Sequence, residues 1–93
     1  MADIGVKQSE RDNGYEFEVT VEEGGSSTHH TVTLDQSDYE RLARGGASPK
    51  ELVAESFRFL LEREPKESIL RSFDLTAISR YFPEYDQEIP ERL

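Results

Sequence analysis

One stretch of sequence, residues 48–64, decides the fold, and it reads SPKELVAESFRFLLERE. It opens with Ser48 and Pro49, and Glu51 follows three positions after the serine. A serine in this position accepts a hydrogen bond from the third helical amide, the glutamate bonds back, and proline suits the first turn. The pattern predicts a helix that begins after Ser48 and runs to about Glu64, where the next residue, a proline, interrupts it.

This helix is apolar over more of its circumference than a surface helix needs. At about 100° per residue, eight mostly apolar side chains sweep about 220° of the circle. They are, in angular order, Phe59, Leu52, Ser56, Leu60, Val53, Phe57, Leu61 and Ala54. In this segment, charge interrupts the arc only at Arg63 and Glu64, in the last turn. An arc this wide predicts cover on two sides. A β-hairpin can supply one cover, and either the C-terminal segment or a second copy of the chain can supply the other.

Upstream of the helix, two alternating segments predict an antiparallel hairpin. Residues 15–22 alternate apolar side chains with glutamate and threonine, and residues 29–34 resume the alternation after the Gly-rich stretch 23–28. Alternation with a period of two is typical of strands with one buried face, and a short Gly-rich loop joins such strands into a hairpin. Residues 1–14 lack a sustained period and are expected to form a flexible N-terminal arm.

Short helices are expected on both sides of the long one. Ser37 and Glu40 repeat the capping pattern, which predicts a helix over residues 38–44 that two glycines terminate. Downstream, residues 65–73 and 75–82 predict two more short helices, the second capped by an aspartate. The last ten residues, 84–93, hold four acids and a proline and are expected to form a loose acidic tail.

Together these elements predict an α+β fold in which an N-terminal antiparallel β-hairpin packs on a long amphipathic helix plus short helices, in the order ββαααα. The chain has 93 residues, which suits one domain. We place that single α+β domain at residues 15–83, between the flexible arm of residues 1–14 and the acidic tail of residues 84–93.

The charge balance narrows the classes of partner. Twenty acids against 11 Lys and Arg give a net charge of −9, and residues 1–47 alone hold ten acids and four bases. This balance argues against nucleic acid and anionic membranes, which attract Lys and Arg, and it points instead to a solubilising face or to a basic protein partner. The apolar runs are too short for a membrane span. Cysteine is absent, which excludes disulfides and fits a cytoplasmic location.

The residue patterns do not predict catalysis. His29 and His30 are neighbours on a strand, so their rings point to opposite faces and do not converge on one metal ion. Glu16 and Glu18 lie about 7 Å apart on one strand face. Carboxylate pairs hydrolyse glycosides only in a cleft, which the solvent face of a hairpin does not offer. We therefore predict no catalytic residue, no metal and no cofactor; a small hydrolase is the remote alternative.

Aromatic residues in the C-terminal third allow two interpretations: they complete a small core, or they contact a partner protein. The second interpretation predicts an interaction surface made of Phe57, Phe59, Leu61, Phe73, Tyr81, Phe82 and Tyr85, with Arg71 and Arg80 at its polar rim. The sequence accordingly predicts a non-enzymatic protein-interaction or regulatory module that binds a protein partner or self-associates as a homodimer.

Residues 29–64, HHTVTLDQSDYERLARGGASPKELVAESFRFLLERE, resemble the ribbon-helix-helix segment of many antitoxins and small bacterial repressors. Strand, short helix, glycine turn and Ser-capped longer helix follow in the same order. The resemblance implies a dimer that pairs this strand between chains and lays it in the DNA major groove. Thr31 and Thr33 would then face the groove, and His29 would lie near the phosphates. Against this function, the preceding strand should occupy the pairing edge, and its exposed face carries three glutamates.

Overall fold

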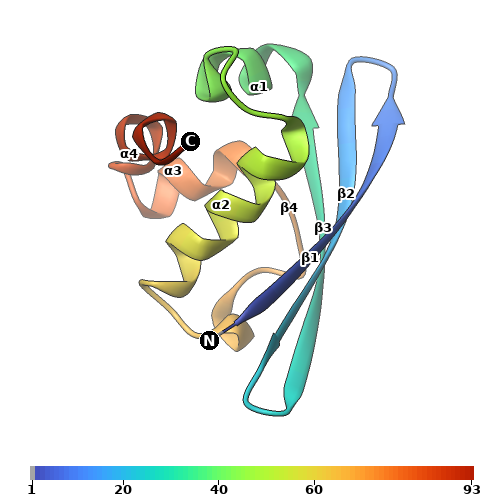
Figure 1. Ribbon diagram of the computed structural model, residues 1–93, viewed down its shortest axis with the longest axis vertical. Helices are drawn as coiled ribbons and strands as arrows, with labels where there is room; N and C mark the ends of the chain where they lie inside the picture. Colours follow the sequence, from blue (N-terminus) through green and yellow to red (C-terminus); the bar gives the residue numbers. More distant parts are fainter. Residues whose placement is uncertain (1) are drawn as a thin grey trace.

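The computed structural model describes residues 2–93, which form a four-stranded mixed sheet with the helices on one of its faces (Figure 1). The strands follow the spatial order β1 (Asp3–Arg11), β2 (Gly14–Glu23), β3 (Ser26–Asp35) and β4 (Ser72–Asp74). The helices are α1 (Gln36–Ala43), α2 (Pro49–Leu61), α3 (Ile78–Tyr81) and α4 (Tyr85–Arg92), with 3-10 turns η1 (Lys66–Ser68) and η2 (Leu75–Ala77). The α+β class is confirmed. The prediction of a two-stranded hairpin is corrected, because two further strands extend the hairpin into a sheet.

The pairing of β2 with β3 follows the predicted alternation. The strands are antiparallel, and Gly24 and Gly25 turn the chain with φ angles of 64° and 83°, which glycine adopts without steric cost. Every second side chain of β2 is buried against the helices, namely Phe17, Val19 and Val21. The intervening residues face the opposite side of the sheet, which Figure 1 shows without a covering helix.

The N-terminal segment is a strand, which corrects the expected flexible arm of residues 1–14. β1 pairs with β2 along its whole length, and Ile4 and Val6 pack against the core. Gln8 and Glu10 follow on the same face of β1 but are exposed, so the alternation of packed and exposed side chains ends at Val6. Two apolar residues were too few for the sequence to indicate a strand. Residue 1 of the expected arm lies outside the described residues.

Helix α1 begins two residues before its predicted start. The amide of Gln36 donates to the carbonyl of Asn13 (2.8 Å), which ties the first turn to the β1–β2 turn. Asp35 therefore occupies the N-cap, and Ser37 lies inside the helix. The side chain of Glu40, expected to complete a capping box, accepts instead from Gln36 Nε2 at 3.0 Å.

The capping of α2 is as predicted. The amide of Glu51 donates to Ser48 Oγ and the amide of Ser48 to Glu51 Oε1, both at 3.1 Å. α2 ends at Leu61, earlier than the expected residue 64. One side of α2 packs on the sheet, and another contacts α1 and α4. The second cover that its wide apolar arc demands thus comes from the same chain.

The last third of the chain departs furthest from expectation. Residues 65–73, predicted as a helix, form η1 and then β4, which runs parallel to β3. Parallel neighbours need a long crossover, and α1 and α2 supply it. The predicted cap of the next helix is confirmed, since Asp74 accepts from the amide of Thr76 (3.2 Å).

The prediction of a loose acidic tail over residues 84–93 is also corrected, because most of this segment forms α4, which packs on the core. Tyr85 and Ile89 lie four residues apart on one helix face and are fully buried. Pro90 stands inside this helix, near its C-terminal end. Among residues 2–93, no helix has both the length and the apolar character needed to cross a membrane.

Candidate functional site: an apolar groove beside α2

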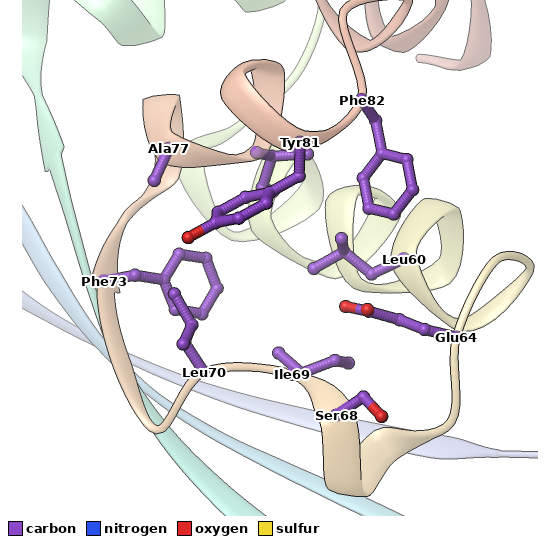
Figure 2. Close-up of a pocket in the computed structure, with 10 residues that line it drawn as sticks. Leu60, Glu64, Ser68, Ile69, Leu70, Phe73, Ala77, Tyr81 and Phe82 are labelled. Carbon is purple, nitrogen blue, oxygen red and sulfur yellow. The ribbon is translucent and has the colours of Figure 1, made fainter.

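An apolar groove of about 320 Å³ lies between the end of α2, the η1–β4 segment and α3 (Figure 2). Its walls come from segments that the chain brings together after leaving α2. The lining residues are Leu60, Glu64, Ser68, Ile69, Leu70, Phe73, Ala77, Ile78, Tyr81 and Phe82. Hereafter, "the groove" denotes this set.

The path of the chain explains why these residues meet. Pro65 follows the last turn of α2 and makes the chain bend back toward the sheet. Pairing of β4 with β3 then sets Phe73 beside Val32, with its ring centroid 6.0 Å from that of Phe57. The cap at Asp74 starts η2 and α3, which carry the remaining wall. Figure 2 shows the Phe73 ring extending into the groove from β4.

A buried histidine fixes the main chain at the rim of the groove. His30 is 1% exposed, and its Nδ1 lies 2.7 Å from the carbonyl oxygen of Leu70. A carbonyl only accepts, so Nδ1 carries the proton and Nε2 accepts from the Thr28 hydroxyl at 2.9 Å. Burial lowers the pKa of His30 and keeps the ring neutral. The prediction that its neighbour His29 lies on the opposite, exposed face is confirmed.

Two large side chains of the groove are exposed. Tyr81 is 67% and Leu70 is 50% exposed, and among residues 2–93 only Leu93 joins them as an exposed large hydrophobic residue. Isolated exposed apolar residues are ordinary on protein surfaces, whereas several around one concave site are typical of binding surfaces. Two of the three exposed large hydrophobic residues of the described chain therefore lie at the groove.

Glu64 is the one charged residue of the lining. Figure 2 shows its side chain reaching from the turn after α2 into the groove, with the carboxylate between Leu60 and Ile69. Burial raises the pKa of Glu64, whose carboxylate makes no ion pair or hydrogen bond within residues 2–93.

A second aromatic cluster, on the α4 side of α2, is closed. It consists of Phe59 and Tyr85, both 0% exposed, with ring centroids 5.3 Å apart. Ser56 Oγ donates to the carbonyl of Leu52 at 2.7 Å, so the Tyr85 hydroxyl donates to Ser56 Oγ at 2.6 Å. Burial raises the pKa of Tyr85. We call these aromatic residues and their polar partners the closed cluster.

Two arginines cover the closed cluster. The guanidinium carbon of Arg63 lies 3.6 Å from the ring centroid of Phe59, in cation–π geometry, and its nitrogens contact Glu84 and Glu88 at 3.3 and 3.1 Å. Arg92 lies 5.9 Å from the same ring and bonds Glu62 at 2.6 Å. The hydrogen bond and charge of Glu62 raise the pKa of Arg92. These contacts close this side of α2 to solvent.

The structure divides the predicted interaction surface between these two clusters and the rest of the molecule. In the core lie Phe57, Phe59 and Tyr85. Leu61 is half-buried and packs on the core. At the groove meet Phe73, Tyr81 and Phe82. The expected rim residues Arg71 and Arg80 are exposed, and they lie outside the lining. The core interpretation is thus confirmed for Phe57, Phe59 and Tyr85, and contact with a partner protein stays a prediction for the residues at the groove.

The residues that the ribbon-helix-helix resemblance singles out lie on the helix-free face of the sheet. β3 is hydrogen-bonded to β2 on one edge and to β4 on the other. Thr33 donates to Asp74 at 2.8 Å, and Glu16 and Glu18 stand opposite Thr33 and Thr31 on β2. The strand that would pair between chains is thus a central strand of its own sheet.

Sequence reasoning did not assign Glu64, Ile69 or Leu70 to the site. The last two were predicted to lie on a helix, whereas they lie between η1 and β4. A signal for Glu64 was present, because its charge interrupts the apolar arc of residues 48–64. A charge on the apolar side of a helix end, next to a proline, indicates a position that faces a partly desolvated space.

Neither metal-ligand geometry nor a relative identifies the site. Within the described residues, 2–93, no three His, Cys, Asp or Glu side chains gather as a metal ion would require. Comparison with known protein families, with curated proteins and with solved structures found no match to this chain.

Proposed function

We propose that this chain is a small acidic protein-interaction module, without catalytic activity, and that the groove is the surface that docks a partner protein. The observation that carries the proposal is the exposure of Tyr81 and Leu70, 67% and 50%, on the walls of one apolar groove. Aromatic side chains in concave apolar sites are the residues that dominate binding energy at protein interfaces.

The size and composition of the groove support docking of a side chain from another protein. Its volume of about 320 Å³ matches the lower end of ligand-sized pockets. Eight of the ten lining residues are apolar or aromatic, namely Leu60, Ile69, Leu70, Phe73, Ala77, Ile78, Tyr81 and Phe82. Such a surface releases ordered water when an apolar group covers it.

The polar groups of the lining favour binding over catalysis. Ser68, Glu64 and the Tyr81 hydroxyl are its polar side-chain groups, and no hydrogen bond joins any two of them in the described chain. Nucleophilic catalysis needs a base within hydrogen-bond reach of the nucleophile. Glu64 is a single carboxylate, whereas general acid–base hydrolysis of glycosides uses two.

A ribbon-helix-helix DNA-binding regulator is the alternative that the sequence leaves open, and no geometric observation favours it. An intermolecular ribbon requires a free edge on β3, which is paired with β2 along its length and with β4 over residues 31–33. A gel-shift titration at low salt distinguishes the two functions, because DNA binding through a basic surface is strongest there. We expect no shift with random or operator-containing DNA.

Affinity capture from the source cell tests the docking function. The wild-type chain and two variants, Tyr81→Ala in the groove and His29→Ala on the exposed sheet face, are immobilised in parallel. We expect at least one protein that wild type and His29→Ala retain and Tyr81→Ala loses, and crosslinking should place it against α3. Equal retention by all three chains would contradict docking in the groove.

A further inference from the structure

The groove holds a charge that the protein itself does not neutralise. Three acids surround the end of α2, and two of them are paired: Glu62 with Arg92 at 2.6 Å, and Glu67 with Lys66 at 2.7 Å. Within residues 2–93, no such contact reaches the carboxylate of Glu64, and burial raises its pKa. The one unpaired acid of this region is thus the acid that faces the groove (Figure 2).

An unpaired carboxylate between apolar walls is an incomplete binding site for a cation. Water is partly removed from Glu64 by Leu60 and Ile69, which lie on either side of it in Figure 2. A lysine or arginine from outside would restore the lost interaction as a charge-assisted hydrogen bond. The methylene stem of such a side chain would also cover the apolar walls, because long basic side chains bury their stems and keep the charge at a polar group.

The total charge favours a basic partner over a second copy of this chain. Each copy carries −9, so two copies repel each other, whereas a basic segment is attracted. Nothing in the lining opposes a cation, since Arg71 and Arg80 lie outside it. Charge complementarity therefore favours a basic segment of another protein over a second copy of this chain as the occupant of the groove.

We propose that the groove binds a segment of a partner protein that inserts a bulky apolar side chain beside Tyr81 and pairs a lysine or arginine with Glu64. This inference rests on the proposed docking function of the groove and adds the chemistry of the partner. The apolar side chain supplies most of the buried area, and the ion pair fixes the register of the segment.

Selection of short random displayed peptides on the purified full chain tests this chemistry. We expect the enriched peptides to combine an aromatic or large aliphatic residue with a lysine or arginine at a constant spacing. One enriched peptide is then synthesised, and calorimetry compares its affinity for wild type and variants. Glu64→Gln keeps the shape of the side chain, and it should weaken binding about tenfold, as loss of one charge-assisted bond predicts.

Glu67→Gln is the matched control. It removes the same charge three residues away, from a side chain that is 63% exposed and outside the lining. General attraction between an acidic protein and a basic peptide falls equally in both variants, so Glu67→Gln should change the affinity less than about twofold. A repeat selection on Glu64→Lys should enrich acidic peptides instead. This result would identify Glu64 as the residue that determines which charge the bound peptide carries.

Two kinds of failure are distinguishable. If the selected peptides need Tyr81 but lose equal affinity in Glu64→Gln and Glu67→Gln, the ion pair is wrong and the docking function stands. If no selected peptide depends on Tyr81, the docking function itself fails. Sedimentation that shows a wild-type dimer and a Tyr81→Ala monomer would assign the groove to a second copy, and would overturn the basic partner. Circular dichroism of each variant verifies that it is folded.

Discussion

Helix α2 contacts two groups of aromatic residues, and solvent reaches only one of them. In the closed cluster, Phe59 and Tyr85 are 0% exposed and lie beneath Arg63 and Arg92. In the groove, Tyr81 is 67% exposed, although it too belongs to a short helix of the C-terminal third. Residue type is therefore not what separates the two groups.

The two regions differ in whether the chain pairs its own polar groups. The hydroxyl of Tyr85 bonds Ser56, and the covering arginines bond glutamates of α2 and α4. Glu64 in the groove, in contrast, has no ion-pair partner within residues 2–93, and burial raises its pKa. In the closed cluster the Tyr85 hydroxyl and both arginines thus have partners within the chain, whereas the Glu64 carboxylate at the groove has none within residues 2–93. Four predictions test this division, from the largest expected effect on stability to the smallest.

Truncation inside the closed cluster should have the largest effect. Phe59→Ala removes a fully buried ring and the surface on which Arg63 stacks, and should lower the free energy of unfolding by about 3–5 kcal/mol. Urea unfolding followed by circular dichroism measures it, with Phe59→Leu as a milder variant if the alanine chain does not fold. The groove variant Tyr81→Ala should change stability by less than about 0.5 kcal/mol. Equal losses in the two variants would contradict the division.

Removal of one hydroxyl from each region gives a finer comparison. Tyr85→Phe loses the bond to Ser56, whose own hydroxyl still donates to the carbonyl of Leu52, so no buried donor is left unpaired. We expect a loss of about 1 kcal/mol. Tyr81→Phe should leave stability unchanged, because the hydroxyl of Tyr81 makes no hydrogen bond within residues 2–93. Thermal unfolding of the two variants side by side provides the measurement.

The histidine at the rim should make stability depend on pH. Burial lowers the pKa of His30 from its usual 6.5, so the folded chain favours the neutral ring and the unfolded chain takes up the proton first. This contribution is fully present above pH 6.5 and decreases as the pH falls through 6.5 toward the folded-state pKa. The slope of unfolding free energy against pH should diminish in His30→Gln and persist in His29→Gln. An unchanged slope in His30→Gln would show that another group is responsible.

The smallest effect on stability should be a gain. Burial raises the pKa of Glu64 above 4.5, so the folded chain holds its proton more tightly than the unfolded chain. Stability therefore falls as the pH rises from 4.5 through the folded-state pKa, and Glu64→Gln removes this loss at neutral pH. We expect a small increase in unfolding free energy for Glu64→Gln and, in contrast, a small decrease for Glu67→Gln, which loses its bond to Lys66. Decreased stability in Glu64→Gln would indicate that its carboxylate has a favourable contact within the chain.

The parts of the fold that could be predicted are those with a local cause. The capping box at Ser48 involves atoms three residues apart, and the β2–β3 turn depends on two adjacent glycines. The opposite orientations of His29 and His30 follow from the geometry of any strand. For the candidate site, the sequence predicted three aromatic lining residues, Phe73, Tyr81 and Phe82, but not Glu64.

The parts that could not be predicted depend on a distant partner. β1 has two core-facing apolar residues and is a strand because β2 offers a free edge beside it. β4 has three residues, and it pairs with β3 only after α1 and α2 have carried the chain across. Tyr85 and Ile89 form a helix face of two residues, too short to indicate a helix without the surface that they cover.

By itself, then, the sequence determined the α+β class, the long capped helix with its wide apolar arc, and the acidic charge, because each depends on residue type and spacing. Tertiary structure alone decided which aromatic residues are enclosed and which line a groove. The physical reason is that burial is a property of what packs against a side chain. α4 and two arginines close one side of α2, while the bend at Pro65 and the pairing of β4 hold Phe73 and Tyr81 apart from that cover.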